Sequence, residues 1–128
     1  LSLGLSLFLK TLPAGRFYPR DVESALVWLD QNAAPNDFVL ADVPTSQLVA
    51  QRTRLRVYVG HEMETLHYED KVKAMESFYE GPASKDWLEQ TQVEWIIYEK
   101  KNSSSFAAGA ELEMVYENDT VTIYKVKR

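Results

Sequence analysis

Two histidines and two glutamates fall within one short segment in the middle of the chain, and these residue types bind divalent metals. They are His61, Glu62, Glu64 and His67. The histidines are six positions apart, whereas a zinc-binding helix places them four apart, so on a helix these two point away from each other. The spacing favours a structural or capping role for this turn. The alternative is a metal site using His61, Glu64 and His67.

The same segment follows residues 55–59, which have the pattern of a strand. Ligands of open parallel sheets bind beyond the carboxyl ends of the strands. Gly60 is expected to form the turn, and Thr65 to cap the next helix. We therefore expect ligand contacts from the turn residues Gly60, His61, Glu62, Glu64 and Thr65.

Three arginines alternate with other residues just before this turn, at Arg52, Arg54 and Arg56. In an extended chain such side chains share one face, and guanidinium groups bind phosphate or carboxylate with two hydrogen bonds. The same row is typical of an edge strand that charge protects from aggregation, and this interpretation is favoured. Arg54 and Arg56 remain candidate ligand-binding residues.

The sequence also contains short polar motifs with other chemistry. It has neither a Gly-x-Ser-x-Gly nucleophile motif nor a glycine-rich phosphate loop. Two segments fit the N-glycosylation sequon, Asn102-Ser103-Ser104 and Asn118-Asp119-Thr120. These sequons matter only if the domain is extracytoplasmic.

Hydrophobic periodicity predicts the elements that position these residues. Helices are expected over residues 19–32, 44–51, 65–80 and 84–90, and strands over 38–43, 55–59 and 93–98, followed by a hairpin of 112–117 and 120–126. Helices that alternate with strands indicate parallel pairing. The predicted fold is a small three-layer α/β domain, with a three-stranded parallel sheet and helical crossovers, extended by a C-terminal antiparallel hairpin.

The first 18 residues form an apolar lead before a single domain spanning residues 19–128. The run from Leu1 to Leu9 is far shorter than the roughly 20 residues that span a bilayer. It is interpreted either as a strand or short helix that packs on the core, or as the trailing end of a segment that has been cut away.

The charge of the chain excludes one class of function. The 128 residues carry 14 Lys and Arg against 19 Asp and Glu, a net charge of -5, which argues against nucleic acid as a partner. Residues 61–94 carry nine acidic and three basic side chains, whereas residues 1–60 carry five acidic and six basic side chains. The absence of cysteine excludes disulfides and thiolate sites. No cofactor is expected.

Several segments together resemble a known kind of domain. They are residues 56–65, 77–81, 95–98, 114–118 and 121–126. Their order resembles the C-terminal soluble domain of large polytopic membrane proteins of bacteria and archaea. Many of those proteins look like glycosyltransferases of the GT-C type, which take sugar from a lipid-phosphate carrier at the outer membrane face. The resemblance covers roughly residues 19–126, and the Gly60-His61 turn matches it best.

The resemblance implies an accessory, non-catalytic, extracytoplasmic domain, because the catalytic carboxylates of that superfamily lie between transmembrane helices. The resemblance also implies that Leu1 to Leu9 are the end of the last transmembrane helix. The expected partners of the domain are its own transmembrane region, lipid headgroups near Lys10, Arg16 and Arg20, and a lipid-linked sugar or acceptor. This chain departs from the relatives at Thr53-Arg54-Leu55, where they often have Thr-Gly-Arg.

Two other classes stay open. One is a free-standing soluble enzyme or divalent-metal module that uses residues 61–67. The other is a protein-interaction module, for which an extended exposed apolar patch would be the sign. Under the membrane hypothesis, the basic end faces the headgroups and the acidic helices lie away from it.

Overall fold

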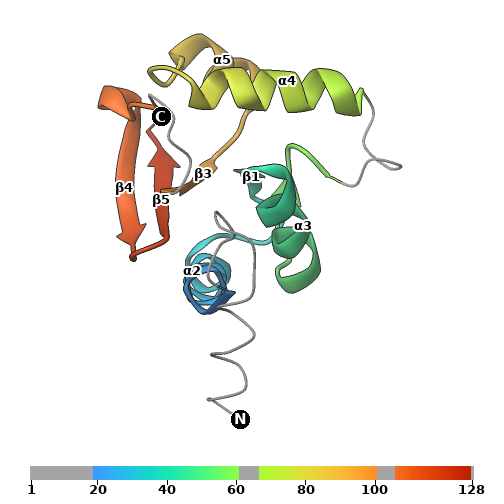
Figure 1. Ribbon diagram of the computed structural model, residues 1–128, viewed down its shortest axis with the longest axis vertical. Helices are drawn as coiled ribbons and strands as arrows, with labels where there is room; N and C mark the ends of the chain where they lie inside the picture. The colour runs from blue at the N-terminus through green and yellow to red at the C-terminus, as the bar shows by residue number, and fades with distance from the viewer. Residues whose placement is uncertain (1–18, 61–66, 101–105, 128) are drawn as a thin grey trace, which may run out of the picture.

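The computed structural model describes residues 19–60, 67–100 and 106–127, which form four α-helices, a short 3-10 helix and five strands (Figure 1). In chain order they are α2 (Pro19–Asn32), β1 (Phe38–Leu40), α3 (Val43–Arg52), β2 (Arg56–Val57), α4 (Tyr68–Tyr79), α5 (Lys85–Thr91), β3 (Trp95–Glu99), η1 (Gly109–Glu111), β4 (Leu112–Glu117) and β5 (Val121–Val126). The predicted α/β class is confirmed. The apolar lead, residues 1–18, lies outside the described residues.

The strands form one mixed sheet in the order β2-β1-β3-β5-β4. β1 pairs in parallel with β2 and β3, while β5 pairs antiparallel with β3 and β4. The antiparallel half is the more extensively paired, since β5 is matched to β3 along the whole of β3. The expected three-stranded parallel sheet is thus corrected to a mixed five-stranded one, because the hairpin joins the sheet directly through β5.

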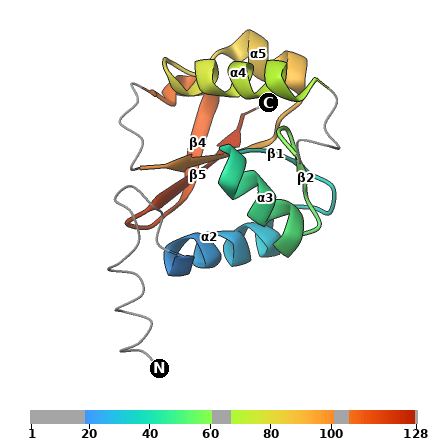
Figure 2. The same cartoon turned by 45° about the vertical axis from the view of Figure 1, so that its right-hand side comes forward.

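Helices cover both faces of this sheet (Figure 2). α2 and α3 pack on one face, and α4 and α5 lie on the other. β3 contributes to both cores, because Trp95 and Ile97 pack with the α2 side and Ile96 with the α4 side. A strand buried on both faces has a continuous apolar sequence, as this one does.

Helix α2 begins and ends where its sequence pattern predicts. Val22, Ala25, Leu26 and Leu29 repeat at helical spacing and are at most 2% exposed. Asp21 lies in the first turn, where a carboxylate interacts favourably with the positive end of the helix dipole. The predicted apolar stripe of this helix is confirmed.

Helices α3 and α5 each begin at a side-chain cap. The carboxylate of Asp42 accepts a hydrogen bond from the Thr45 amide at 2.9 Å, and the hydroxyl of Ser84 accepts one from the Trp87 amide at 3.3 Å. The predicted strand over residues 38–43 is therefore too long. It ends at Leu40, because Asp42 caps α3 instead of continuing the ladder.

The first turn of α2 is fastened to the turn between β4 and β5. Asn118 donates from Nδ2 to the carbonyl of Asp21 at 2.8 Å, and the Thr120 hydroxyl donates to the Asp21 carboxylate at 2.5 Å. Because Val121 pairs with Glu99, the last residue of β3, this turn lies where β3 ends. The chain therefore enters the described domain at the carboxyl edge of the parallel strands.

Candidate functional site

The turn that the sequence favours as a site is only partly described. Gly60 follows β2 and is half-buried. His61, Glu62, Glu64 and Thr65 lie outside the described residues, so their expected ligand contacts and the expected Thr65 cap stay predictions. His67 is exposed and precedes α4 with a left-handed φ of 58° and no side-chain cap bond. Within the described ranges, no three histidine, aspartate or glutamate side chains gather as a metal site.

The three arginines do not form one extended row. Arg52 is the last residue of α3 and pairs with Glu23 of α2. Arg54 is exposed between α3 and β2. Arg56 lies on the edge strand β2, where its guanidinium stacks 4.9 Å from the centre of the Phe38 ring and donates to the Asn36 carbonyl at 2.9 Å. Ligand binding by Arg54 and Arg56 stays a prediction.

A surface pocket of about 380 Å³ lies at the carboxyl end of β1, between the start of α3 and one side of α4. We call it the carboxyl-edge pocket, and it is lined by Asp42, Val43, Pro44, Val72, Met75, Glu76, Tyr79 and Glu80. The connection from β1 leads to β2, whereas β3 lies on the other side of β1. Strand order thus reverses beside this pocket, and such a point is where open α/β sheets bind ligands.

Tyr79 joins the pocket to the sheet. Its hydroxyl donates to the carbonyl of Ile97 in β3 at 2.7 Å and lies 3.4 Å from the carbonyl of Leu40 in β1. The ring is partly exposed, but the hydroxyl lies between two strands and is buried there. Burial raises the pKa of Tyr79 well above its ordinary 10.0, and the negative charge of Asp42 raises it further. At neutral pH the phenol therefore remains a hydrogen-bond donor.

Among the residues that the structure describes, the charges around the pocket are all of one sign. Asp42, Glu76 and Glu80 line it, and no described lysine, arginine or histidine does. Asp42 lies at the positive end of the α3 dipole, but Glu76 and Glu80 lie at the negative end of α4, whose last turn carries no basic residue. An apolar wall with carboxylates at its rim suits a ligand that has a cationic or hydroxyl-bearing group and an apolar body.

A larger pocket, of about 540 Å³, lies near the C-terminal end of β5 beside α5. It is lined by Lys85, Leu88, Glu89, Glu111, Val126 and Lys127. Its two lysines and two glutamates balance in charge, and it lies at the opposite edge of the sheet from the end of β1. Topology and charge therefore both favour the carboxyl-edge pocket as the candidate site.

Sequence reasoning missed the residues of this pocket. Asp42 carried a usable signal, because it follows the first buried strand just as Gly60 follows the second. Tyr79 and Glu80 carried none, since only the tertiary fold brings the last turn of α4 to the end of β1.

Comparison with models of protein families and with curated proteins found no match to this sequence. Among residues 19–60, 67–100 and 106–127, no helix is long and apolar enough to cross a membrane. The large apolar side chains that this part of the chain exposes most are Val27 on α2 and Met114 on β4. The observations that bear on function are therefore the fold and the carboxyl edge of the sheet.

Alkaline pH is expected to lower the free energy of unfolding, and Tyr79→Phe to reduce that dependence. Unfolded Tyr79 ionises near pH 10.0, whereas folded Tyr79 keeps its proton. The contribution of the buried phenol to the free energy of unfolding is therefore complete below pH 10.0 and is lost as the pH rises above it. Tyr79→Phe also costs about 1–2 kcal/mol at neutral pH, because the Ile97 carbonyl loses its donor. Urea unfolding between pH 7 and pH 11 measures both effects.

The matched control is Tyr68→Phe, at the start of the same helix. Burial also raises the pKa of Tyr58 and Tyr124, so Tyr79→Phe should flatten only part of the alkaline fall. Equal pH profiles for Tyr79→Phe and the unsubstituted protein would show that the Tyr79 phenol is not sequestered.

Proposed function

We propose that this chain is an accessory, non-catalytic, extracytoplasmic domain of a membrane glycosyltransferase-like protein of the GT-C type, which uses a lipid-linked sugar donor. In this proposal the domain contributes substrate or partner contacts through the carboxyl edge of its sheet. The resemblance of residues 56–65, 77–81, 95–98, 114–118 and 121–126 to such domains is the starting point.

The observation that carries the proposal is the attachment of α2 to the β4–β5 turn. Asp21 is held by Asn118 and Thr120, so any segment before Pro19 joins the domain at the carboxyl edge. A membrane stem at that end places the carboxyl edge, with its pocket, toward the bilayer. This is where contacts with a lipid-linked donor or its acceptor are needed.

Charge supports a particular arrangement at the membrane. α4 and α5 carry five acidic and three basic side chains and cover the face opposite to α2 (Figure 2). The last turn of α4 still reaches the carboxyl edge, where Glu76 and Glu80 line the pocket. Anionic headgroups repel these carboxylates, so the pocket stays open to solvent beside the membrane. It is thus placed for an acceptor or partner group rather than for lipid.

The reading frame upstream of Leu1 tests the membrane proposal directly. It should encode a series of apolar segments of about 20 residues each, the length that crosses a bilayer. A tag at the C-terminus of the full protein should then be accessible to protease added outside intact cells. A frame that starts close to Leu1 with no apolar segments would remove the proposal, as would a tag protected until the cells are lysed.

Glu76→Gln in the full-length protein is expected to raise the KM for the acceptor about threefold and to leave kcat unchanged. The loss of one partly exposed charge contact changes binding by up to ~1 kcal/mol, and an accessory group contacts the acceptor without touching the reacting atoms. Initial rates of sugar transfer at varied acceptor concentration measure the split.

Glu69→Gln is the matched control, because Glu69 is exposed on the same helix and does not line the pocket. Equal KM values for the two variants would contradict a role for the pocket in acceptor binding. A fall in kcat alone for Glu76→Gln would instead indicate a contact to the reacting groups.

A further inference from the structure

The second sequon of the chain forms the turn between β4 and β5. Asp119 is exposed at the tip of this turn, as expected of an N-glycosylation acceptor site. The atoms that define the sequon nevertheless point inward, toward the first turn of α2. The first sequon, at Asn102, lies outside the described residues.

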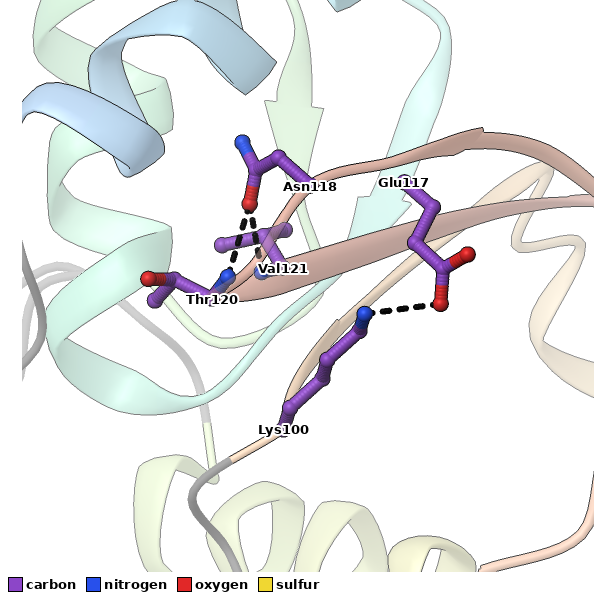
Figure 3. A network of polar contacts seen from close by, with 5 residues as sticks. All are labelled: Lys100, Glu117, Asn118, Thr120 and Val121. Carbon is purple, nitrogen blue, oxygen red and sulfur yellow. Dashed lines mark hydrogen bonds and ion pairs between the residues drawn. The ribbon is translucent and has the colours of Figure 1, made fainter.

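Every polar atom of the Asn118 side chain has a partner. Its Oδ1 accepts from the amides of Thr120 at 2.9 Å and Val121 at 2.8 Å (Figure 3). Its Nδ2 donates to the Asp21 carbonyl at 2.8 Å and to the Tyr116 hydroxyl at 3.3 Å. The amide nitrogen that would accept a glycan therefore uses both of its hydrogens inside the fold.

The hydroxyl of the sequon is enclosed as well. Thr120 is 2% exposed, and its hydroxyl donates to the carboxylate of Asp21. Beside it, Lys100 of the neighbouring segment pairs with Glu117 at 2.7 Å and braces the turn from the other side (Figure 3). A transferase that reads both Asn118 and Thr120 therefore finds, in the folded domain, a partly exposed Asn118 whose amide is already hydrogen-bonded and a Thr120 hydroxyl that is enclosed.

We propose that Asn118 is an N-glycan acceptor only until the β4–β5 turn docks on α2, so that folding closes the site. In the reaction, Nδ2 forms a bond to the anomeric carbon of a lipid-diphosphate-linked sugar. The bond from that carbon to the phosphate oxygen breaks, the lipid diphosphate leaves with the electron pair, and a base takes one amide proton. The unfolded chain permits this, because Asp21 and Asn118 are 97 positions apart and only folding joins them.

Docking of the β4–β5 turn on α2 also affects chains that are modified at Asn118 before they fold. A glycan on Nδ2 replaces one of its two hydrogens and needs the space that α2 occupies in the folded domain. A modified chain therefore cannot restore both bonds from Nδ2, one to the Asp21 carbonyl and one to the Tyr116 hydroxyl. Modification at this position therefore marks chains that met the transferase before folding. This inference rests on the extracytoplasmic location in the proposed function, but it concerns this chain as an acceptor and not as part of a glycosyltransferase.

The test uses a purified oligosaccharyltransferase and a lipid-diphosphate oligosaccharide, with Asn102→Gln in every variant so that a mass gain reports Asn118. The folded chain is compared with Leu29→Asp and, separately, Ile123→Asp, which place a charge at positions 0% exposed and unfold the domain. We expect modification of the folded chain to be at least about 100-fold slower, since a folded domain is open in about one molecule in a thousand or fewer.

Circular dichroism verifies which variants are unfolded, and Asn118→Gln must abolish the mass gain in all of them. Equal rates of glycan transfer to the folded and the unfolded chains would overturn the proposal that folding closes the acceptor site. Failure of both unfolded variants to gain a glycan would overturn the acceptor role.

Discussion

Leu26→Ala is expected to lower the free energy of unfolding by about 3 kcal/mol, the usual cost of removing a leucine from a packed core. Leu26 is 2% exposed and packs in the α2 side of the core, which also contains Trp95 and Ile97 of β3. The substitution removes apolar burial and leaves a cavity between the helix and the sheet. Urea unfolding followed by tryptophan fluorescence measures the loss.

Val27→Ala is the matched control, since Val27 is the next residue of the same helix and is 55% exposed. Alanine favours helix more than valine does, so the control should stay within about 0.5 kcal/mol of the unsubstituted protein. Equal losses for the two variants would mean that α2 does not present the face seen here to the sheet.

Leu26 also shows how much of the fold the sequence could predict. The spacing of Val22, Ala25, Leu26 and Leu29 alone identifies the buried face of α2, because one face of a helix repeats every 3.6 residues. The apolar run at residues 95–98 likewise identifies β3 as a strand buried on both faces. This periodicity depends only on residues that are neighbours in the sequence, so it can be recognised without a structure.

The arrangement of the strands could not be predicted in the same way. The alternating pattern of residues 112–126 predicts a hairpin correctly, but it does not say which strand of the hairpin adjoins β3. That choice depends on pairs such as Glu99 with Val121, which are far apart in the sequence. Asp42 was placed in a strand for a related reason, because an apolar run does not show where capping of the next helix ends it.

The candidate site, like the fold, could be predicted from the sequence only in part. The rule that ligands bind beyond the carboxyl ends of parallel strands led to Gly60 after β2, and the pocket instead follows β1, the neighbouring strand. The Gly60 site stays a prediction. The rule leads to the carboxyl edge of the sheet, where the described pocket also lies, but it does not give a position along that edge. The position depends on where α4 ends, and the packing of Phe78 and Tyr79 against the sheet determines that.

Asn118→Ala is expected to lower the free energy of unfolding by about 2–3 kcal/mol, although the residue lies in a surface turn. Its side chain satisfies the amides of Thr120 and Val121 and also joins the turn to α2 through Asp21. Each buried group that loses its partner costs about 1–3 kcal/mol, and neighbouring losses are not fully additive. Thermal and urea unfolding measure the change, and Asp119→Ala, at the exposed tip, should shift stability by no more than about 0.5 kcal/mol.

Asn118→Asp separates the two roles of this side chain. A carboxylate still accepts from the amides of Thr120 and Val121, but it cannot donate to the Asp21 carbonyl and it places a negative charge near the Asp21 carboxylate. We therefore expect the β4–β5 turn to survive and the first turn of α2 to exchange its amide hydrogens faster. Unchanged exchange at Val22 and Glu23 would show that Asn118 stabilises the hairpin alone. In that case the attachment of α2 would depend on the bond from Thr120 to Asp21 and on the packing of Trp28 with Tyr116.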